Sequence, residues 1–123
     1  MKPHHRLLAA PAVLLASLAL AFAAAPRPHP RSFTGQIMDS QCAAMGNHNA
    51  GYKMTGTHTP RECTLACVRA GGHFVLYNTR SKITYKLDNQ KAPRAFAGEQ
   101  VTVIGTLRPG AHTIHVEEIE PIR

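Results

Sequence analysis

The sequence has no tryptophan, few aromatic residues and no two adjacent Lys or Arg residues. Aromatic side chains make up 6% of the 123 residues, and the formal net charge of +7 comes from scattered positions. Proteins that bind single-stranded nucleic acid usually combine a basic groove with aromatic rings on which bases stack. Nucleic acid is therefore a disfavoured partner, and a loose attraction to anionic surfaces is the simpler interpretation of the charge.

Recognisable catalytic motifs are lacking as well. The chain contains no Ser/His/Asp order, no phosphate-binding loop and no paired acidic motif. It also has no Cys-x-x-Cys pair, although Cys63 falls near an expected helix N-terminus, where the helix dipole lowers the pKa of a thiol. We therefore expect a protein that is not an enzyme, with thiol redox chemistry as the one activity left open.

The N-terminal segment is typical of a secretory signal. Lys2 and Arg6 precede an uncharged, Ala- and Leu-rich run that ends in small residues, and Ala23 is the expected cleavage position. A retained transmembrane helix is the alternative, because the uncharged run nearly reaches the roughly 20 residues that span a bilayer. We expect residues 1–23 to be a signal peptide that exports the chain to the periplasm or the extracellular space.

The segment after the signal is rich in proline and should be a linker. Pro26, Pro28 and Pro30 alternate with other residues over 24–31, which excludes a helix and favours a stiff, extended chain. Residues 32–123 then form one small domain with no transmembrane segment. A core of that size benefits from a cross-link or a metal ion.

Hydrophobic patterning predicts a domain that is mainly β. Thr59, Pro60 and Glu62 have the order of a helix start, and Gly71 and Gly72 mark its end. The segment 40–59 has no helical or strand period and is predicted to be a loop. Alternating apolar residues predict five strands, and a short helix is expected at 93–97; the strands are 32–39, 73–77, 82–87, 100–107 and 112–119.

This order of elements favours a small five-stranded barrel of the OB type, in an α+β chain dominated by β structure. A Cys-bearing loop and helix would be inserted between the first two strands, and the short helix would lie between the third and fourth. Gly35 and Gly105 would allow the sharp bends that such a barrel needs. An antiparallel sheet with one packed helix is the alternative.

All three cysteines fall in the segment between the first two strands. Cys63 and Cys67 are four residues apart and share one face of the expected helix, while Cys42 follows the first strand and His48 lies six residues further on. Three thiolates and one imidazole are the composition of a tetrahedral zinc site. Cys42, His48, Cys63 and Cys67 are therefore the candidate metal ligands.

Two other interpretations of the cysteines remain open. Met45 and Met54 in the same segment suit Cu(I), which prefers soft ligands. In an oxidising compartment a disulfide from Cys42 to Cys63 or Cys67 would stabilise a small domain and leave one spare thiol. The spacing of the cysteines matches no standard zinc motif, so composition alone does not separate a metal ion from a disulfide.

Other polar residues have simpler structural roles. Asp39 and Ser40 are interpreted as a turn after the first strand, because both side chains readily bond the local backbone. His73, His112 and His115 occur among strand residues and are expected to be surface histidines or histidines with satisfied hydrogen bonds, not metal ligands.

Three stretches of the sequence carry a resemblance. Residues 33–48 contain Asp-Ser-x-Cys with a following His, residues 62–72 contain Cys-x3-Cys-Val, and residues 85–90 read Tyr-Lys-Leu-Asp-Asn-Gln. Together they resemble a family of small exported bacterial proteins of unknown function with an OB-like domain. The resemblance implies the fold and export, and it treats Cys42, His48, Cys63 and Cys67 as one unit, but it implies no activity.

The sequence thus predicts an exported, non-enzymatic small domain with a Cys/His site that binds Zn or Cu. The alternative is a disulfide-stapled OB-like module that binds a protein, an oligosaccharide or a nucleic acid.

Overall fold

The computed structural model describes residue 1 and residues 25–123, so the predicted signal peptide lies, Met1 apart, outside the described residues. The described part folds into five strands, three short α-helices and one 3-10 helix. In chain order these are β1 (Arg31–Asp39), α1 (Ser40–Met45), α2 (Asn49–Thr55), α3 (Pro60–Arg69), β2 (Phe74–Asn78), β3 (Ile83–Leu87), η1 (Ala92–Phe96), β4 (Gln100–Arg108) and β5 (Thr113–Pro121).

The proline-containing segment before β1 has no regular secondary structure. Residues 25–30 are exposed, and β1 begins at Arg31. Among the helices of the described part, none has the length and apolarity that crossing a bilayer requires.

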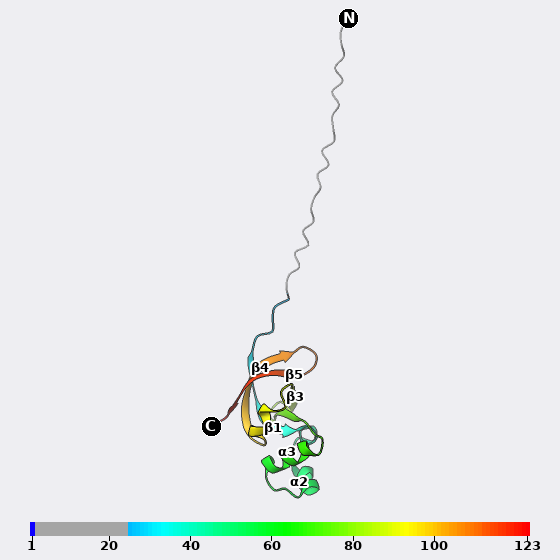
Figure 1. Cartoon of the computed structure of the whole chain (residues 1–123), viewed down its shortest axis with the longest axis vertical. Coiled ribbons are helices and arrows are strands. Elements are labelled where there is room, and N and C mark those ends of the chain that lie inside the picture. Colours follow the sequence, from blue (N-terminus) through cyan, green and yellow to red (C-terminus); the bar gives the residue numbers. More distant parts are fainter. Residues whose placement is uncertain (2–24) are drawn as a thin grey trace.

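The five strands form a closed barrel in the order β1-β2-β3-β5-β4, with β4 pairing back onto β1. All neighbouring strands are antiparallel except β3 and β5, which pair in parallel. The prediction of a five-stranded, mainly β, barrel-like domain is therefore confirmed. Figure 1 shows the barrel with the long β4–β5 hairpin on one side and α2 and α3 together beyond one end.

Close backbone approach explains both strand glycines singled out by the sequence, because a Cβ atom at Gly35 or at Gly105 would collide with a carbonyl oxygen of a neighbouring strand, that of Tyr77 or of His115. A Cβ atom at Gly35 would lie 2.6 Å from the carbonyl oxygen of Tyr77 on the neighbouring strand. Gly105 follows a register shift in the pairing of β4 with β5. Bulges of this kind increase the local bend of a strand.

The prediction of a loop over residues 40–59 is wrong, because two short helices occupy most of it. Helix α1 begins after Asp39, whose carboxylate accepts hydrogen bonds from the backbone N–H groups of Gln41 and Cys42, and it ends at Gly46 in the left-handed conformation. Helix α2 ends in the same way at Gly56. Helices of six or seven residues are too short to show a hydrophobic period, so their caps were the only available signal.

Helix α3 begins where the sequence predicts. The Thr59 hydroxyl accepts a hydrogen bond from the Glu62 N–H at 3.2 Å, and the Glu62 carboxylate accepts one from the His58 N–H at 3.2 Å. These reciprocal bonds satisfy N–H groups at the helix start that have no partner within the helix. The helix ends at Arg69, and Gly71 adopts a positive φ of 110° just beyond it.

The buried side chains form two separate clusters. The barrel cluster fills the inside of the barrel and consists of Phe33, Ile37, Phe74, Leu76, Leu87, Ala97, Val101, Val103 and Ile114. The cysteine cluster lies on the other face of β1 and β2, against the helices, and consists of Met38, Cys42, Ala43, Cys63, Cys67, Val75 and Tyr77. Strand β2 is buried on both faces because its alternate side chains enter different clusters.

Candidate metal centre

Three free, buried cysteines converge from two helices. Cys42 is supplied by α1, and Cys63 and Cys67 lie one turn apart on α3. Their exposed fractions are 0%, 0% and 4%, and their three Sγ atoms all lie within 4.8 Å of one another. Helix α3 holds its two thiols on this side while Leu65 and Val68 pack against the barrel cluster.

The distance between the thiols suits a shared metal ion better than a disulfide. The Sγ atoms of Cys42 and Cys63 are 3.9 Å apart, and all three cysteines are free. A disulfide bond is about 2.05 Å long. Two thiolates that bind one zinc ion with bonds of about 2.3 Å at a tetrahedral angle are about 3.8 Å apart. The structure therefore has no disulfide and holds the sulfurs at a ligand-like separation.

A glycine of α2 closes the space beside the sulfurs. A Cβ atom at Gly51 would lie 2.5 Å from the Cys63 Sγ, 2.8 Å from the Cys42 Sγ and 3.9 Å from the Cys67 Sγ. Contacts of the first two lengths are too short for any side chain. Only glycine lets α2 approach the thiols this closely, and no feature of the sequence indicated that role for Gly51.

Asp39 and His48 form a second group of donors that shares Cys42. One carboxylate oxygen of Asp39, one ring nitrogen of His48 and the Cys42 Sγ lie within 4.8 Å of one another. Asp39 is fully buried and His48 is 8% exposed. The Asp39 Oδ2 atom and both ring nitrogens of His48 have no hydrogen-bond partner. His48 also stacks on the ring of Tyr52, with ring centroids 5.7 Å apart.

The structure brings together part of the predicted ligand set. Cys42, Cys63 and Cys67 form one group, whereas His48 joins Cys42 through a different group that includes Asp39. Asp39 is interpreted from the sequence as a turn residue, and its side chain does bond the local backbone. In the structure these bonds cap α1, and the second carboxylate oxygen has no hydrogen-bond partner. An Asp that directly precedes a Cys-bearing helix was the signal that sequence reasoning underused.

The methionines are arranged differently from the expectation. Met45 and Met54 are 45% and 66% exposed, whereas Met38 is buried within the cysteine cluster. The thioethers expected to favour Cu(I) therefore face solvent.

Burial sets the protonation of the donors when no ion is bound. It raises the pKa of the Cys42 thiol far above its usual value, and the neighbouring Asp39 carboxylate raises that pKa further. Burial likewise raises the pKa of Cys67 to about 11, again with a contribution from Asp39. Burial lowers the pKa of His48, although Asp39 opposes this shift. A cation would stabilise the thiolates, so its binding should release protons.

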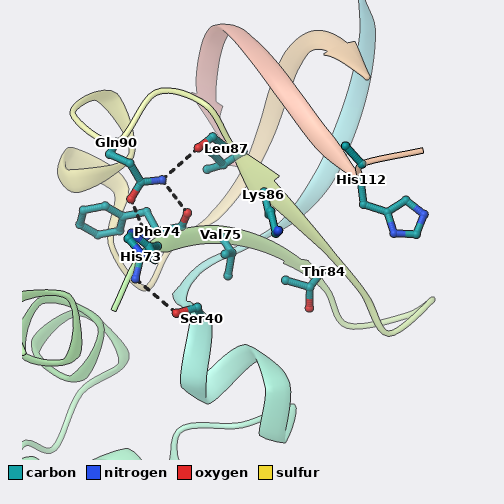
Figure 2. Close-up of a pocket in the computed structure, with 10 residues that line it drawn as sticks. Ser40, His73, Phe74, Val75, Thr84, Lys86, Leu87, Gln90 and His112 are labelled. Atoms are coloured by element: carbon teal, nitrogen blue, oxygen red, sulfur yellow. Dashed lines mark hydrogen bonds between the residues drawn. The ribbon is translucent and has the colours of Figure 1, made fainter. Parts of the chain in front are cut away.

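A separate pocket lies on the barrel surface, at β2, β3 and the β4–β5 turn (Figure 2). Its volume is about 570 Å³, and its walls include the basic side chains of His73, Lys86 and His112 but no acidic side chain. Both histidines are exposed, as the sequence predicts, and so is His115. The side chain of Gln90 braces one wall by bonding the backbone N–H and carbonyl oxygen of Phe74 at 2.8 Å and 2.9 Å.

Comparison with protein families gives a match over part of the chain. Residues 67–122 match the model of a family described as a protein of unknown function (DUF5818). This segment contains β2 to β5 and Cys67, and it leaves Cys42, His48 and Cys63 outside. The match agrees with the expected resemblance to an uncharacterised family. No curated protein and no solved structure matches the chain.

Proposed function

We propose that this protein is an exported, non-enzymatic metal-binding domain whose site is built from Cys42, Cys63, Cys67 and His48. The observation that carries the proposal is the convergence of three buried free thiols within 4.8 Å of one another. Packing them there without an ion leaves three polarisable groups facing a glycine that cannot accept a hydrogen bond through a side chain. Three thiolates are a donor set that binds Zn²⁺, so a bound ion accounts for the convergence of the cysteines.

Zn²⁺ is the ion that we expect first, and Cu⁺ is the alternative. Thiolate, imidazole and carboxylate donors all suit Zn²⁺, which binds sulfur, nitrogen and oxygen ligands. Cu⁺ prefers sulfur, and the thioethers of Met45 and Met54 face solvent. The mixed donors around Cys42 therefore favour Zn²⁺.

The proposed fold and location are consistent with a metal site of this kind. The strand order 1-2-3-5-4 with closure onto β1 supports assignment of the barrel to the OB type. The signal-like segment 1–23 supports export, after which the domain would begin near residue 32. In an oxidising compartment, an ion bound to all three thiolates would also protect them from disulfide formation.

Metal analysis of the chain secreted from a bacterial host tests the proposal. We expect stoichiometric zinc or copper, no reactive free thiol before a chelator is added, and three reactive thiols after chelation in denaturant. The Cys63→Ser variant should lose the ion, whereas Ser40→Ala, which removes a hydroxyl but no thiol from α1, should retain it. A chain with one free thiol, one disulfide and no bound metal would contradict the proposal.

The second candidate function is a binding module, and the pocket at Lys86 favours it. Three basic side chains and no acidic one line the pocket, and the ligand face of OB barrels lies on the second and third strands. Every Phe and Tyr side chain within residues 25–123 is buried or half-buried, which disfavours base stacking. An acidic oligosaccharide therefore fits this pocket better than a nucleic acid.

Calorimetric titration with trigalacturonate tests this second function. We expect salt-sensitive binding that Lys86→Ala removes and that Lys82→Ala, on the same hairpin but outside the pocket, leaves intact. Absence of heat at low salt, or equal binding by the Lys86 variant, would contradict the oligosaccharide module.

A further inference from the structure

The two donor groups around Cys42 are each complete enough to hold an ion. One group consists of Cys42, Cys63 and Cys67, and the other of Asp39, Cys42 and His48. Each contributes three donors from buried side chains, and only Cys42 belongs to both. A thiolate sulfur has several lone pairs, so one thiolate can bind two cations at once.

The donors of the second group are prepared for a ligand that the protein itself does not supply. The Asp39 Oδ1 atom accepts hydrogen bonds from the N–H groups of Gln41 and Cys42 at 3.0 Å and 3.2 Å. These bonds fix the carboxylate and leave Oδ2 without a partner. Both ring nitrogens of His48 are also unpartnered. Buried polar atoms are almost always satisfied, and a bound cation would satisfy the Asp39 Oδ2 atom and one ring nitrogen of His48.

The charge of the donor set matches two ions. Once metal binding has displaced the thiol protons, three thiolates and the Asp39 carboxylate carry four negative charges. One divalent ion bound by all of these donors would leave two negative charges among buried groups, which is costly. Within the described residues, no Lys or Arg side chain forms a salt bridge with Asp39. Two divalent ions make the donor set neutral.

We propose that the centre binds two divalent ions, with Cys42 as a thiolate shared between a Cys42/Cys63/Cys67 site and an Asp39/Cys42/His48 site. This inference rests on the proposed function, since it requires that the thiolates bind metal. It assigns His48 and Asp39 to a second ion rather than assigning His48 as the fourth ligand of the first. It also explains why His48 groups with Cys42 and not with all three thiols.

Native mass spectrometry of the zinc-loaded chain tests the inference by counting bound ions. We expect two zinc ions in the unaltered protein and one in each of Asp39→Asn and His48→Gln. Asparagine caps helices as well as aspartate does, so Asp39→Asn should preserve α1. The matched controls are Asp88→Asn and His115→Gln, which alter an exposed Asp–His pair far from any cysteine in sequence and should retain two ions.

The outcomes separate this inference from the proposed function. One ion in the unaltered protein, lost in Cys63→Ser but kept in His48→Gln, would overturn the second site and leave the thiolate site standing. One ion that His48→Gln also removes would overturn the second site in favour of a single four-ligand site. No bound ion in any variant would overturn both proposals.

Discussion

The barrel cluster and the cysteine cluster differ in how they satisfy their buried atoms. The barrel cluster consists of nine apolar residues and is sealed by strands that pair on both sides. Within residues 25–123, the four buried side-chain N or O atoms without a partner all lie outside the barrel cluster, on Asp39, His48 and Thr64, next to or within the helices. The barrel cluster has no unsatisfied buried side-chain N or O atom, whereas the metal-binding proposal predicts that the helical end is completed by an added ion.

Removing metal should affect the two regions unequally, and this is the largest effect that we expect. A chelator at neutral pH should make amides of α1 and α3 exchange with solvent at least about tenfold faster, because the ion ties the two helices together. Amides of β1 and β4 should change little. Hydrogen exchange followed by mass spectrometry measures this, and a uniform change over the whole chain would contradict the division.

Truncating a barrel side chain should destabilise the fold without changing metal binding. Leu76 is fully buried in the barrel cluster, so Leu76→Ala should lower the free energy of unfolding by about 2–5 kcal/mol. The number of ions bound by the folded variant should not change. Urea denaturation combined with metal analysis checks both points, and loss of metal from folded Leu76→Ala would show that the regions are coupled.

A methyl group added at the centre should weaken the helical end. Alanine in place of glycine within a helix normally stabilises by about 0.5–1 kcal/mol. At Gly51 the added Cβ would meet two sulfurs at 2.5 Å and 2.8 Å, so Gly51→Ala should instead destabilise by about 1–3 kcal/mol and lower zinc affinity.

The expected change in stability at Gly51 has the opposite sign to that of an ordinary Gly→Ala substitution in a helix. The Asn49→Ala variant, at an exposed position of the same helix, should leave zinc affinity unaltered. A Gly51→Ala variant that is more stable than the parent protein and binds zinc with the same affinity would show that α2 does not approach the thiols closely.

The smallest expected effect concerns Asp88 and His115, an exposed Asp–His pair that can be compared with buried Asp39 and His48. Asp88 accepts the Val116 N–H at 3.0 Å and lies 2.6 Å from a ring nitrogen of His115 and 3.3 Å from Arg108. The backbone bond from Val116, together with His115 and Arg108, holds the pKa of this carboxyl below its usual value. A depressed carboxyl pKa stabilises the fold above the unfolded pKa of about 3.9 and loses that effect as the pH falls.

We therefore expect Asp88→Asn to cost less than about 1 kcal/mol at neutral pH, because the pair is solvent-screened. The difference from the parent protein should disappear as the pH falls through the lowered pKa of Asp88, because the carboxyl then becomes protonated in both states. Thermal unfolding across pH measures this, and a difference that grows on acidification would contradict the assignment.

The parts of the fold that the sequence predicts well are those with strong local signals. Helix α3 carries its cap at Thr59 and Glu62, and the alternation over 100–107 follows the period of a half-buried strand. The parallel pairing of β3 with β5 joins segments distant in the sequence, so no local pattern reveals it. Helices α1 and α2 were missed because each is shorter than two periods of a hydrophobic stripe.

The candidate site was predicted in composition but not in arrangement. The three cysteines meet because α3 presents Cys63 and Cys67 on one face and Asp39 starts α1 at the right place for Cys42. The position of His48 depends on the turn between α1 and α2, which spacing alone does not fix. The close approach of Gly51 depends on tertiary packing and leaves no trace in the local sequence.

X-ray absorption at the zinc edge of the secreted, metal-loaded protein tests the central claim most directly, because it identifies the atoms bound to the ion. Thiolate coordination by Cys42, Cys63 and Cys67 predicts a shell of sulfur neighbours at about 2.3 Å. Cys63→Ser, which should lose the thiolate-bound ion, should lose most of this shell. A spectrum with only nitrogen and oxygen neighbours, or a protein that takes up no metal, would contradict a metal centre at these cysteines.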